Sequence, residues 1–450
     1  MVRLEMSRIE MRIGVVTPSR GRNLRCARAS WRCGHPERSG SVAHGVPLVT
    51  EMDLPVLDTL DPSLRGERFH EAMRELSADA WLASAPYGYV VLDREAGSFF
   101  LRTRAATFPG MKIAELFGVD DGPLREEMDR NILHISGDDH RRLRNLVNPA
   151  FTPRAADRWR PAMREFLAQL WDGVSAAGRC EFVEDFAKPY PSLTIATVMG
   201  APLEDAPRLH HWSNWIQKQF DADSLINERA LIDEAVAEFY VYADGLLAAR
   251  RESAGDDLIS TLIAAEEEGD RLSDVELVNL VLNVLIGGVD TTQSQLAHAL
   301  RLFALHPDQW ERLAAEPELA AQAVEEVLRF EPITPFTARI THEDVEFRDV
   351  VFPAGTVVLV CAFTGNRDGE NIAEPEAFDI LADRGSTKPL TFGAGIHYCL
   401  GSNLAKAEMQ EALQFLAPRM KDLALDGEPV FGSVQGIYHL ESLPLRYTAA

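Results

Sequence analysis

The chain has 450 residues, of which 46% are hydrophobic, so it can bury a sizeable core. Its formal net charge of −24 makes nucleic acid and anionic membrane surfaces poor general partners. The sequence contains no run of apolar residues long enough for a membrane span, so we expect none. The five cysteines lie far apart, which predicts a reducing, cytoplasmic environment without a disulfide framework.

The first fifty residues differ from the rest of the chain. They hold nine arginines against three glutamates and show no sustained apolar periodicity. We therefore predict that residues 1–51 form a disordered N-terminal extension and that a single large domain covers residues 52–450.

Beyond residue 53 the patterns are mostly helical. Short apolar runs at 89–92 and 98–101 flank a turn at Gly97 and predict a β-hairpin. A long helix is expected from 273 to about 306, followed by a strand-rich segment over 335–365. Further helices are predicted at 64–76, 139–147, 157–176, 188–199, 205–220, 228–252 and 317–331.

A glycine-rich loop places Cys399 directly before an amphipathic helix. The N–H groups at a helix start favour a thiolate, and Phe392 would shield the sulfur from water. A buried structural cysteine is the plainer alternative. A zinc site would need several close ligands, and only His397 is near. A dinucleotide fingerprint fails because Tyr398 stands where its third glycine belongs.

The predicted long helix contains two adjacent glycines followed by an acid and a hydroxyl. Gly287 and its neighbour each cost roughly 1 kcal/mol relative to alanine, which is tolerated where something must approach the helix backbone. Asp290 and Thr291 follow at once. Asn283 shares a helical stripe with Gly287, so its amide needs either a substrate oxygen or a hydrogen bond to Asn279 or the backbone.

These segments resemble the haem loop and the distal helix of the cytochrome P450 family. The loop pattern of that family is Phe-x-x-Gly-x-(Arg/His)-x-Cys-x-Gly, and every fixed position is filled here. The resemblance covers roughly residues 53–448 and implies the cytochrome P450 fold, mainly α with small β-sheets. It implies haem b (iron protoporphyrin IX), with Cys399 as the iron ligand and Phe392 and Gly393 beside it.

The resemblance also implies the catalytic residues. Gly287 would widen the helix to admit dioxygen, Thr291 would hydrogen-bond that oxygen, and Asp290 would relay protons toward it. The activity implied is that of a monooxygenase of the soluble bacterial (class I) type. A peroxide-driven peroxygenase of the same fold and a non-catalytic haem-binding protein are the alternatives, and the intact Asp-Thr pair counts against both.

Cations in the family's positions are expected to bind the haem propionates, because carboxylates favour arginine and histidine partners. They are His140, Arg144, Arg339 and His397.

A structural ion pair is expected from Glu326 and Arg329, which match the family's Glu-x-x-Arg motif. Ala377 stands where many members carry an arginine that completes a triad, and Arg384 is a candidate replacement.

By resemblance, the substrate pocket is apolar and suits a steroid, terpenoid, fatty acid or polyketide. The residues expected to line it are Leu285, Val289, Phe336, Ile437, Tyr438 and Asn283.

Electrons are expected from ferredoxin and an NAD(P)H-dependent ferredoxin reductase. A small basic patch of Arg141, Arg142, Lys388 and Lys406 would attract such an acidic partner.

Overall fold

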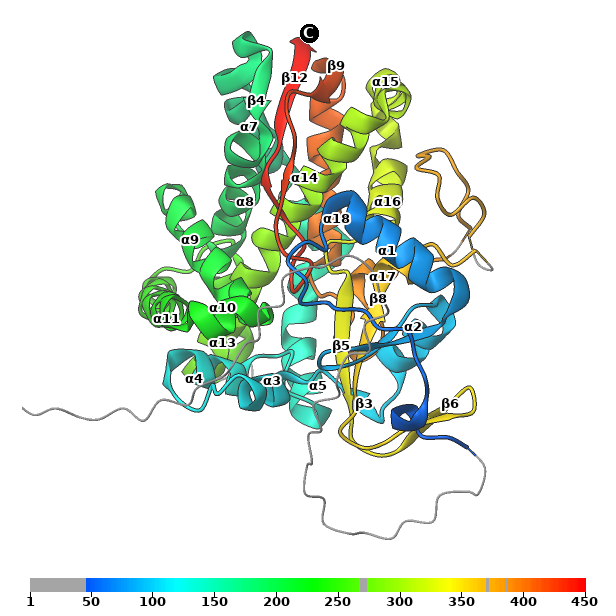
Figure 1. Cartoon of the computed structure of the whole chain (residues 1–450). Helices are drawn as coiled ribbons and strands as arrows, with labels where there is room; N and C mark the ends of the chain where they lie inside the picture. The colour runs from blue at the N-terminus through cyan, green and yellow to red at the C-terminus, as the bar shows by residue number, and fades with distance from the viewer. Residues whose placement is uncertain (1–45, 268–272, 370–371, 386) are drawn as a thin grey trace, which may run out of the picture. The chain divides into compact units, whose positions relative to one another are not determined.

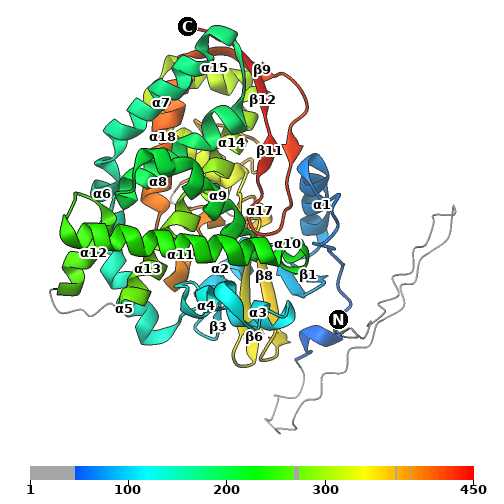
Figure 2. The same ribbon diagram turned by 90° about the vertical axis from the view of Figure 1, so that its left-hand side faces the viewer.

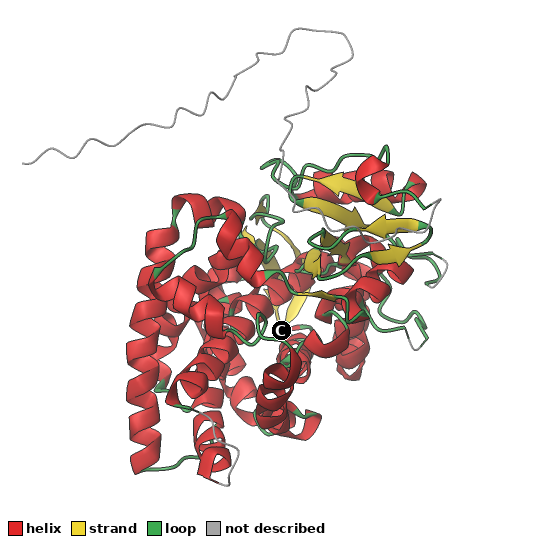
Figure 3. Cartoon of the chain, turned by 90° about the horizontal axis from the view of Figure 1, so that it is seen from below, coloured by secondary structure: helices red, strands yellow, loops and turns green. Residues whose placement is uncertain are grey.

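The computed structural model describes residues 46–267, 273–369, 372–385 and 387–450. Helices dominate and gather on one side, whereas most strands lie together on the other (Figure 3). This arrangement confirms the predicted fold class, mainly α with small sheets.

The α-helices are α1 (Gly66–Asp79), α2 (Arg94–Arg102), α3 (Gly110–Leu116), α4 (Gly122–Arg130), α5 (Gly137–Val147), α6 (Pro153–Asp157), α7 (Arg160–Val174), α8 (Pro189–Met199), α9 (Ala206–Gln217), α10 (Ala222–Asn227), α11 (Arg229–Glu252), α12 (Leu258–Glu267), α13 (Asp274–Gly288), α14 (Asp290–Leu305), α15 (Pro307–Ala315), α16 (Ala320–Phe330), α17 (Ala362–Gly365) and α18 (Ser402–Leu416). The predicted helices outside the 273–306 segment are each found, with ends displaced by a few residues. Figure 2 shows α11 lying across α9 and α13.

The strands are β1 (Leu82–Ala85), β2 (Gly88–Val91), β3 (Ala106–Thr107), β4 (Arg179–Glu181), β5 (Phe336–Thr341), β6 (Val345–Phe347), β7 (Val350–Phe352), β8 (Val357–Cys361), β9 (Met420–Leu425), β10 (Val430–Phe431), β11 (Leu440–Ser442) and β12 (Pro444–Ala449). The largest sheet has the order β1-β2-β8-β5-β3, in which only β2 and β8 are parallel. Figure 1 labels its strands β3, β5 and β8. Its strand β5 supplies Phe336 and Arg339 to the cavity described below.

The hairpin predicted from 89–92 and 98–101 was wrong in its second strand. The hairpin is formed by β1 and β2, and residues 98–101 belong to helix α2. The carboxylate of Asp93 caps α2 by accepting a hydrogen bond of 2.8 Å from the backbone N–H of Ala96. Phe100 and Leu101 are buried on this helix, and so short an apolar run fits a helix as well as a strand.

The long helix predicted over 273–306 is interrupted at Val289, between α13 and α14. Val289 has φ −92° and ψ −73°, off the usual helical values. The hydroxyl of Thr291 donates a 2.5 Å hydrogen bond to the carbonyl of Gly287, a side-chain bond that commonly bends helices. Glycines on one side and this bond on the other therefore account for the break.

The stretch Asp274–Leu305 is long and apolar enough to cross a membrane by length and composition. However, 67% of its most apolar window is buried inside the protein, as in a core helix, so it is weak evidence for a span.

The folded unit begins earlier than the predicted start at residue 52. It extends from Val46 to Ala450. Val49 is only 1% exposed and belongs to the core cluster around β6, β7 and β8. The backbone N–H of Val351 donates to the carbonyl of Pro47 at 3.0 Å. Residues 46–51 are therefore part of the fold, and the prediction for residues 1–45 lies outside the described part of the chain.

Candidate active site

The loop before α18 is shaped by two glycines in left-handed conformations. Gly393 has φ +67° and Gly395 has φ +72°. A Cβ atom at Gly395 would lie 2.6 Å from the carbonyl oxygen of Leu101, so the loop packs too closely for a side chain there. The backbone N–H of Cys399 donates to the carbonyl of Phe392 at 3.0 Å and closes the loop.

The protonation of Cys399 departs from the simple expectation for a helix start. Burial raises the pKa of its thiol, and the backbone N–H groups of Gly401 and Ser402 together with Arg144 offset only part of that effect. Burial therefore outweighs the helix N-terminus in the protein by itself. A bound metal cation is what would favour the thiolate at this position.

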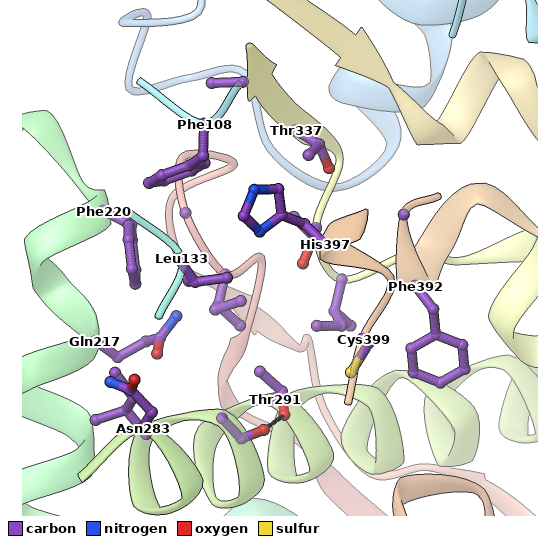
Figure 4. A pocket seen from close by; sticks show the side chains of 18 of the residues that line it. Phe108, Leu133, Gln217, Phe220, Asn283, Thr291, Thr337, Phe392, His397 and Cys399 are labelled. Atoms are coloured by element: carbon purple, nitrogen blue, oxygen red, sulfur yellow. Dashed lines mark hydrogen bonds between the residues drawn. The ribbon is translucent and has the colours of Figure 1, made fainter. Parts of the chain in front are cut away.

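Cys399 faces a cavity of about 500 Å³, a size typical of ligand pockets. Figure 4 shows Cys399 and Phe392 at one end, Thr291 along one wall and Asn283 with Gln217 at the far end. The predicted site residues that line it are Arg144, Asn283, Gly287, Thr291, Phe336, Arg339, Phe392, Gly393, His397, Cys399 and Ile437.

Three predicted propionate partners line the cavity, and their side chains form at most one hydrogen bond each among the described residues. Arg339 is buried, and the only hydrogen bond of its guanidinium among the described residues goes to the carbonyl of Ala338 at 2.8 Å; burial lowers its pKa to about 10. Both ring nitrogens of His397 are buried without a hydrogen-bond partner, and burial lowers its pKa to about 3. Arg144 donates to the carbonyl of Tyr398 at 2.8 Å.

His140 stands behind this group and does not line the cavity. Its ring lies 4.5 Å from that of His397, measured between centroids. Among the described residues neither Arg144 nor Arg339 forms an ion pair, so the half-buried guanidinium of Arg144 and the buried one of Arg339 both lack an anion. A cofactor carrying two carboxylates fits these residues, and a thiol at the same cavity fits an iron ligand. The site is thus consistent with haem.

Thr291 and Asp290 point in different directions. Thr291 lines the cavity, whereas the carboxylate of Asp290 accepts a 2.6 Å hydrogen bond from the hydroxyl of Ser213 on α9. Asp290 is 5% exposed, and burial raises its pKa despite that bond. The carboxylate of Asp290 therefore does not face the cavity directly, and its predicted relay role stays a prediction.

Three residues expected in the pocket lie elsewhere. Leu285 and Val289 are fully buried in the helical core, because the cavity-facing stripe runs through Asn283 and Gly287. The hydroxyl of Tyr438 accepts a 2.7 Å hydrogen bond from the backbone N–H of Gly66, so this side chain braces the start of α1.

Several polar residues that line the cavity were not predicted from the sequence. Gln217, Gln219 and Asn131 line it, as do Thr292 and Glu408. Glu408 is 1% exposed, and burial raises the pKa of its carboxyl well above the usual value. Polar residues of this kind occur on many exposed helix faces, so no sequence signal separated these from surface residues.

The Glu326–Arg329 pair is buried, as predicted, and Arg384 completes a triad. Arg329 Nε donates to Glu326 Oε2 at 2.7 Å, and Arg384 Nη2 donates to Glu326 Oε1 at 2.7 Å. Arg329 also holds the following loop through hydrogen bonds of 2.8 Å to the carbonyls of Pro375 and Ala377. Arg384 therefore replaces the arginine that is missing at position 377.

Comparison with known proteins identifies the family. The family model described as "Cytochrome P450" matches residues 121–416. Luteothin monooxygenase of Streptomyces thioluteus is 36% identical over 403 residues, which cover 88% of this chain and 97% of that protein. Cytochrome P450 monooxygenase PikC of Streptomyces venezuelae is 35% identical, over 71% of this chain and 76% of that protein.

Solved structures agree with this result. The crystal structure of CalO2 matches with a TM-score of 0.80 and 28% identity, covering 88% of this chain and 100% of that one. The structure of epothilone D-bound cytochrome P450epoK also gives a TM-score of 0.80, with 26% identity over 87% of this chain and 99% of that one. With its cysteine loop, its cavity and these relatives, the chain belongs to the cytochrome P450 family of bacterial monooxygenases.

Proposed function

We propose that this monooxygenase uses haem b to hydroxylate a hydrophobic small molecule of the polyketide class. The observation that carries the proposal is the largely apolar cavity between Thr291 and Cys399, beside a buried arginine, Arg339, and a half-buried one, Arg144, that both lack an anion. Arg144, Arg339 and His397 would hold the haem propionates, and Cys399 would ligate the iron. Bound in this way, haem supplies the reductive activation of dioxygen and the transfer of one oxygen atom to the substrate.

The chain's own residues would orient the substrate and manage protons. Thr291 presents a hydroxyl on the cavity wall, where it can donate a hydrogen bond to dioxygen by releasing the carbonyl of Gly287. Asp290 is buried behind that wall, one residue away, and burial raises the pKa of its carboxyl, which favours the protonated form relative to an exposed aspartate. The apolar side chains of Phe336 and Ile437 exclude water from the substrate.

The substrate class is supported by the lining and by the relatives. Most of the cavity wall is apolar, and α3, β5 and the C-terminal segment contribute Ile113, Phe336 and Ile437 to it. The names of similar proteins include "Polyketide biosynthesis cytochrome P450 PksS" and "Mycinamicin IV hydroxylase/epoxidase". Fatty acids remain a second candidate, because a similar structure was solved in complex with myristic acid. Steroids are a third, since another contains testosterone.

For electron supply we propose a separate ferredoxin with an NAD(P)H-dependent reductase. The expected basic patch would attract an acidic ferredoxin. Two of its cations are already paired with acids, Arg141 with Asp138 at 3.1 Å and Lys406 with Glu325 at 2.5 Å, which reduces the positive charge that the patch offers. We also propose a cytoplasmic location, which is supported by the free thiols of the buried Cys180 and Cys361.

Replacement of the cysteine tests the proposal. In Cys399→Ser, the long-wavelength Soret band of the reduced carbon-monoxide complex should disappear, because the thiolate ligand is lost. An unchanged band would refute the ligand assignment.

Catalysis is tested by supplying ferredoxin, reductase and NADPH, and separately hydrogen peroxide alone. We expect a product heavier by one oxygen atom only with the electron-transfer system, and Thr291→Ala should lower the product formed per NADPH while keeping the Soret band. Product with peroxide alone would favour the peroxygenase, and no product under either condition would favour a haem carrier.

A further inference from the structure

The side-chain amide of Asn283 is held in one orientation at the far end of the cavity. Its Oδ1 accepts a 3.1 Å hydrogen bond from the backbone N–H of Ile132. Rotating the amide would set its NH₂ group against that N–H, donor against donor. The NH₂ group therefore points the other way, and its nitrogen is buried without a hydrogen-bond partner among the described residues. A buried donor of this kind calls for an acceptor.

A second amide stands at the same end. Gln217, the last residue of α9, lines the cavity, and its side chain forms no hydrogen bond within the described chain. Figure 4 shows the amides of Gln217 and Asn283 near one another, with Thr291 between them and Cys399. No hydrogen bond joins the two amides, so one oxygen atom between them could accept from both.

The surroundings favour a neutral acceptor over a carboxylate. Asn131 and Gln219 also line this cavity, and both are amides rather than cations. Glu127 lies directly behind, where its carboxylate accepts a 2.5 Å hydrogen bond from Asn131 Nδ2. A substrate carboxylate at this end would meet another acid and no cation of this cluster, which is unfavourable in a buried site.

We propose that Asn283 and Gln217 form a subsite that binds a neutral oxygen acceptor of the substrate, such as a ketone, ester or hydroxyl oxygen. The inference rests on the proposed monooxygenase function and narrows its substrate class to oxygen-bearing molecules. Asn283 lies on α13 eight residues before Thr291, which stands at the start of α14, and Figure 4 shows Thr291 between Asn283 and Cys399. A substrate oxygen held at this end would orient the molecule and so fix which of its carbons lies near Thr291 and Cys399.

Three probes of equal chain length separate the possibilities: dodecan-2-one, dodecane and dodecanoate. Their dissociation constants are measured on the haem-loaded protein at about pH 8, by calorimetry and by the Soret shift on binding. We expect the wild type to bind the ketone about 3- to 10-fold more tightly than the alkane, as one or two hydrogen bonds would give. Dodecanoate should gain no such advantage.

Two variants test the amides. Asn283→Asp keeps an acceptor for the Ile132 N–H and loses the donor, and Gln217→Leu removes the second amide. Both should reduce the ketone's advantage to less than 2-fold. The matched control is Asn279→Asp, one turn earlier on α13, where the amide is satisfied by Val275 and Tyr240 and does not line the cavity. This control should leave the advantage unchanged.

Equal affinity of wild type for ketone and alkane, or an undiminished advantage in both variants, would overturn the subsite. Tighter binding of dodecanoate than of the ketone would overturn its preference for a neutral group. The carbon-monoxide spectrum distinguishes these failures from failure of the proposed function: a normal wild-type band with equal probe affinities removes the subsite alone.

Discussion

Glu127 is a buried carboxyl whose titration falls near neutral pH. Burial raises its pKa from 4.5 to about 7, although hydrogen bonds from Asn131 and Gln219 act in the opposite direction. Because the pKa is higher in the folded than in the unfolded protein, its stabilising contribution is complete below about pH 4.5 and is lost as the pH rises through 7. Between pH 5 and pH 8 the loss amounts to roughly 2 kcal/mol.

We therefore predict that the free energy of unfolding of Glu127→Gln, relative to that of the wild type, is higher at pH 8 than at pH 5. Denaturant midpoints of variant and wild type, compared at both pH values, measure the difference. Glu126→Gln is the control, because its carboxylate is exposed on the same helix. A stability difference that does not change with pH would show that Glu127 does not titrate in this range.

Individual residues were predictable where a short motif fixes their surroundings. Cys399, Phe392 and Gly393 lie within a few positions of one another, so local chemistry alone places them together. The direction of the Asp290 side chain did not follow from the sequence, because adjacent helical residues are separated by about 100° and the helix breaks at Val289. Gln217 depends on how α9 packs against α13, which no local pattern encodes.

The two adjacent glycines of α13 differ in what lies next to them. A Cβ atom at Gly288 would lie 2.3 Å from Ile195 Cδ1 on α8, whereas one at Gly287 would meet nothing within 4 Å. We predict that Gly288→Ala destabilises the fold by about 1–3 kcal/mol through overpacking. Gly287→Ala should not, since alanine also favours the helix by about 1 kcal/mol.

Thermal unfolding of both variants measures this contrast. Ile195→Val removes the clashing methyl group, so it should restore part of the stability of Gly288→Ala. Gly287→Ala should instead weaken ligand binding, because its methyl group would project into the cavity. Equal stability of the two variants would mean that α8 and α13 can move apart freely.

The Glu326 triad joins α16 to the loop before the cysteine segment. Burial opposes ionisation of Glu326, but Arg329 and Arg384 outweigh it and lower the pKa of the carboxyl. Glu326→Ala leaves Arg329 buried without an anion, so we predict a loss of about 3–5 kcal/mol. Arg384→Ala should cost less, about 1.5–3 kcal/mol, because Arg329 and the backbone N–H of Asp379 still satisfy Glu326.

Denaturant midpoints of the haem-loaded variants measure which of the two substitutions costs more stability. Arg312→Ala serves as control, since its pair with Glu316 is exposed and i, i+4 pairs of this kind contribute only tenths of a kcal/mol. A larger loss for Arg384→Ala than for Glu326→Ala would contradict the assigned order.

Elements with long periodic patterns were predictable, and short ones were not. The 24-residue helix α11 has an apolar stripe, and its predicted ends were nearly right. The run 98–101 is too short to distinguish a helical period from a strand period. The N-cap at Asp93, which marks the start of α2, was not included in the prediction. Strand pairing of β5 with β8 links residues far apart in the chain, so its register follows only from the whole fold.

At the scale of the whole molecule, the cavity lies where the helical side and the strand-rich side meet. α13 and α14 provide one wall, β5 the opposite one and the cysteine loop an end. Residues from widely separated segments therefore converge on one site. Sequence motifs could identify the reaction, whereas the substrate end of the cavity depends on this convergence.

The start of the folded unit is also a property of the whole molecule. A chain that begins at Met52 lacks Val49, which is buried in the cluster around β6, β7 and β8, and the hydrogen bond from Val351 to Pro47. We predict that it is less stable than a chain that begins at Val46 by about 2–4 kcal/mol, from one buried valine and one hydrogen bond.

Denaturant unfolding of the two truncated proteins measures this difference directly. Val49→Ala in the full chain should reproduce part of it, because the core loses two methyl groups. Thr50→Ala should have little effect, since that side chain is exposed. Equal midpoints for the two truncated proteins would show that residues 46–51 contribute nothing to stability. A domain that starts at residue 52 would then be as stable as one that starts at Val46, because other apolar side chains would fill the place of Val49.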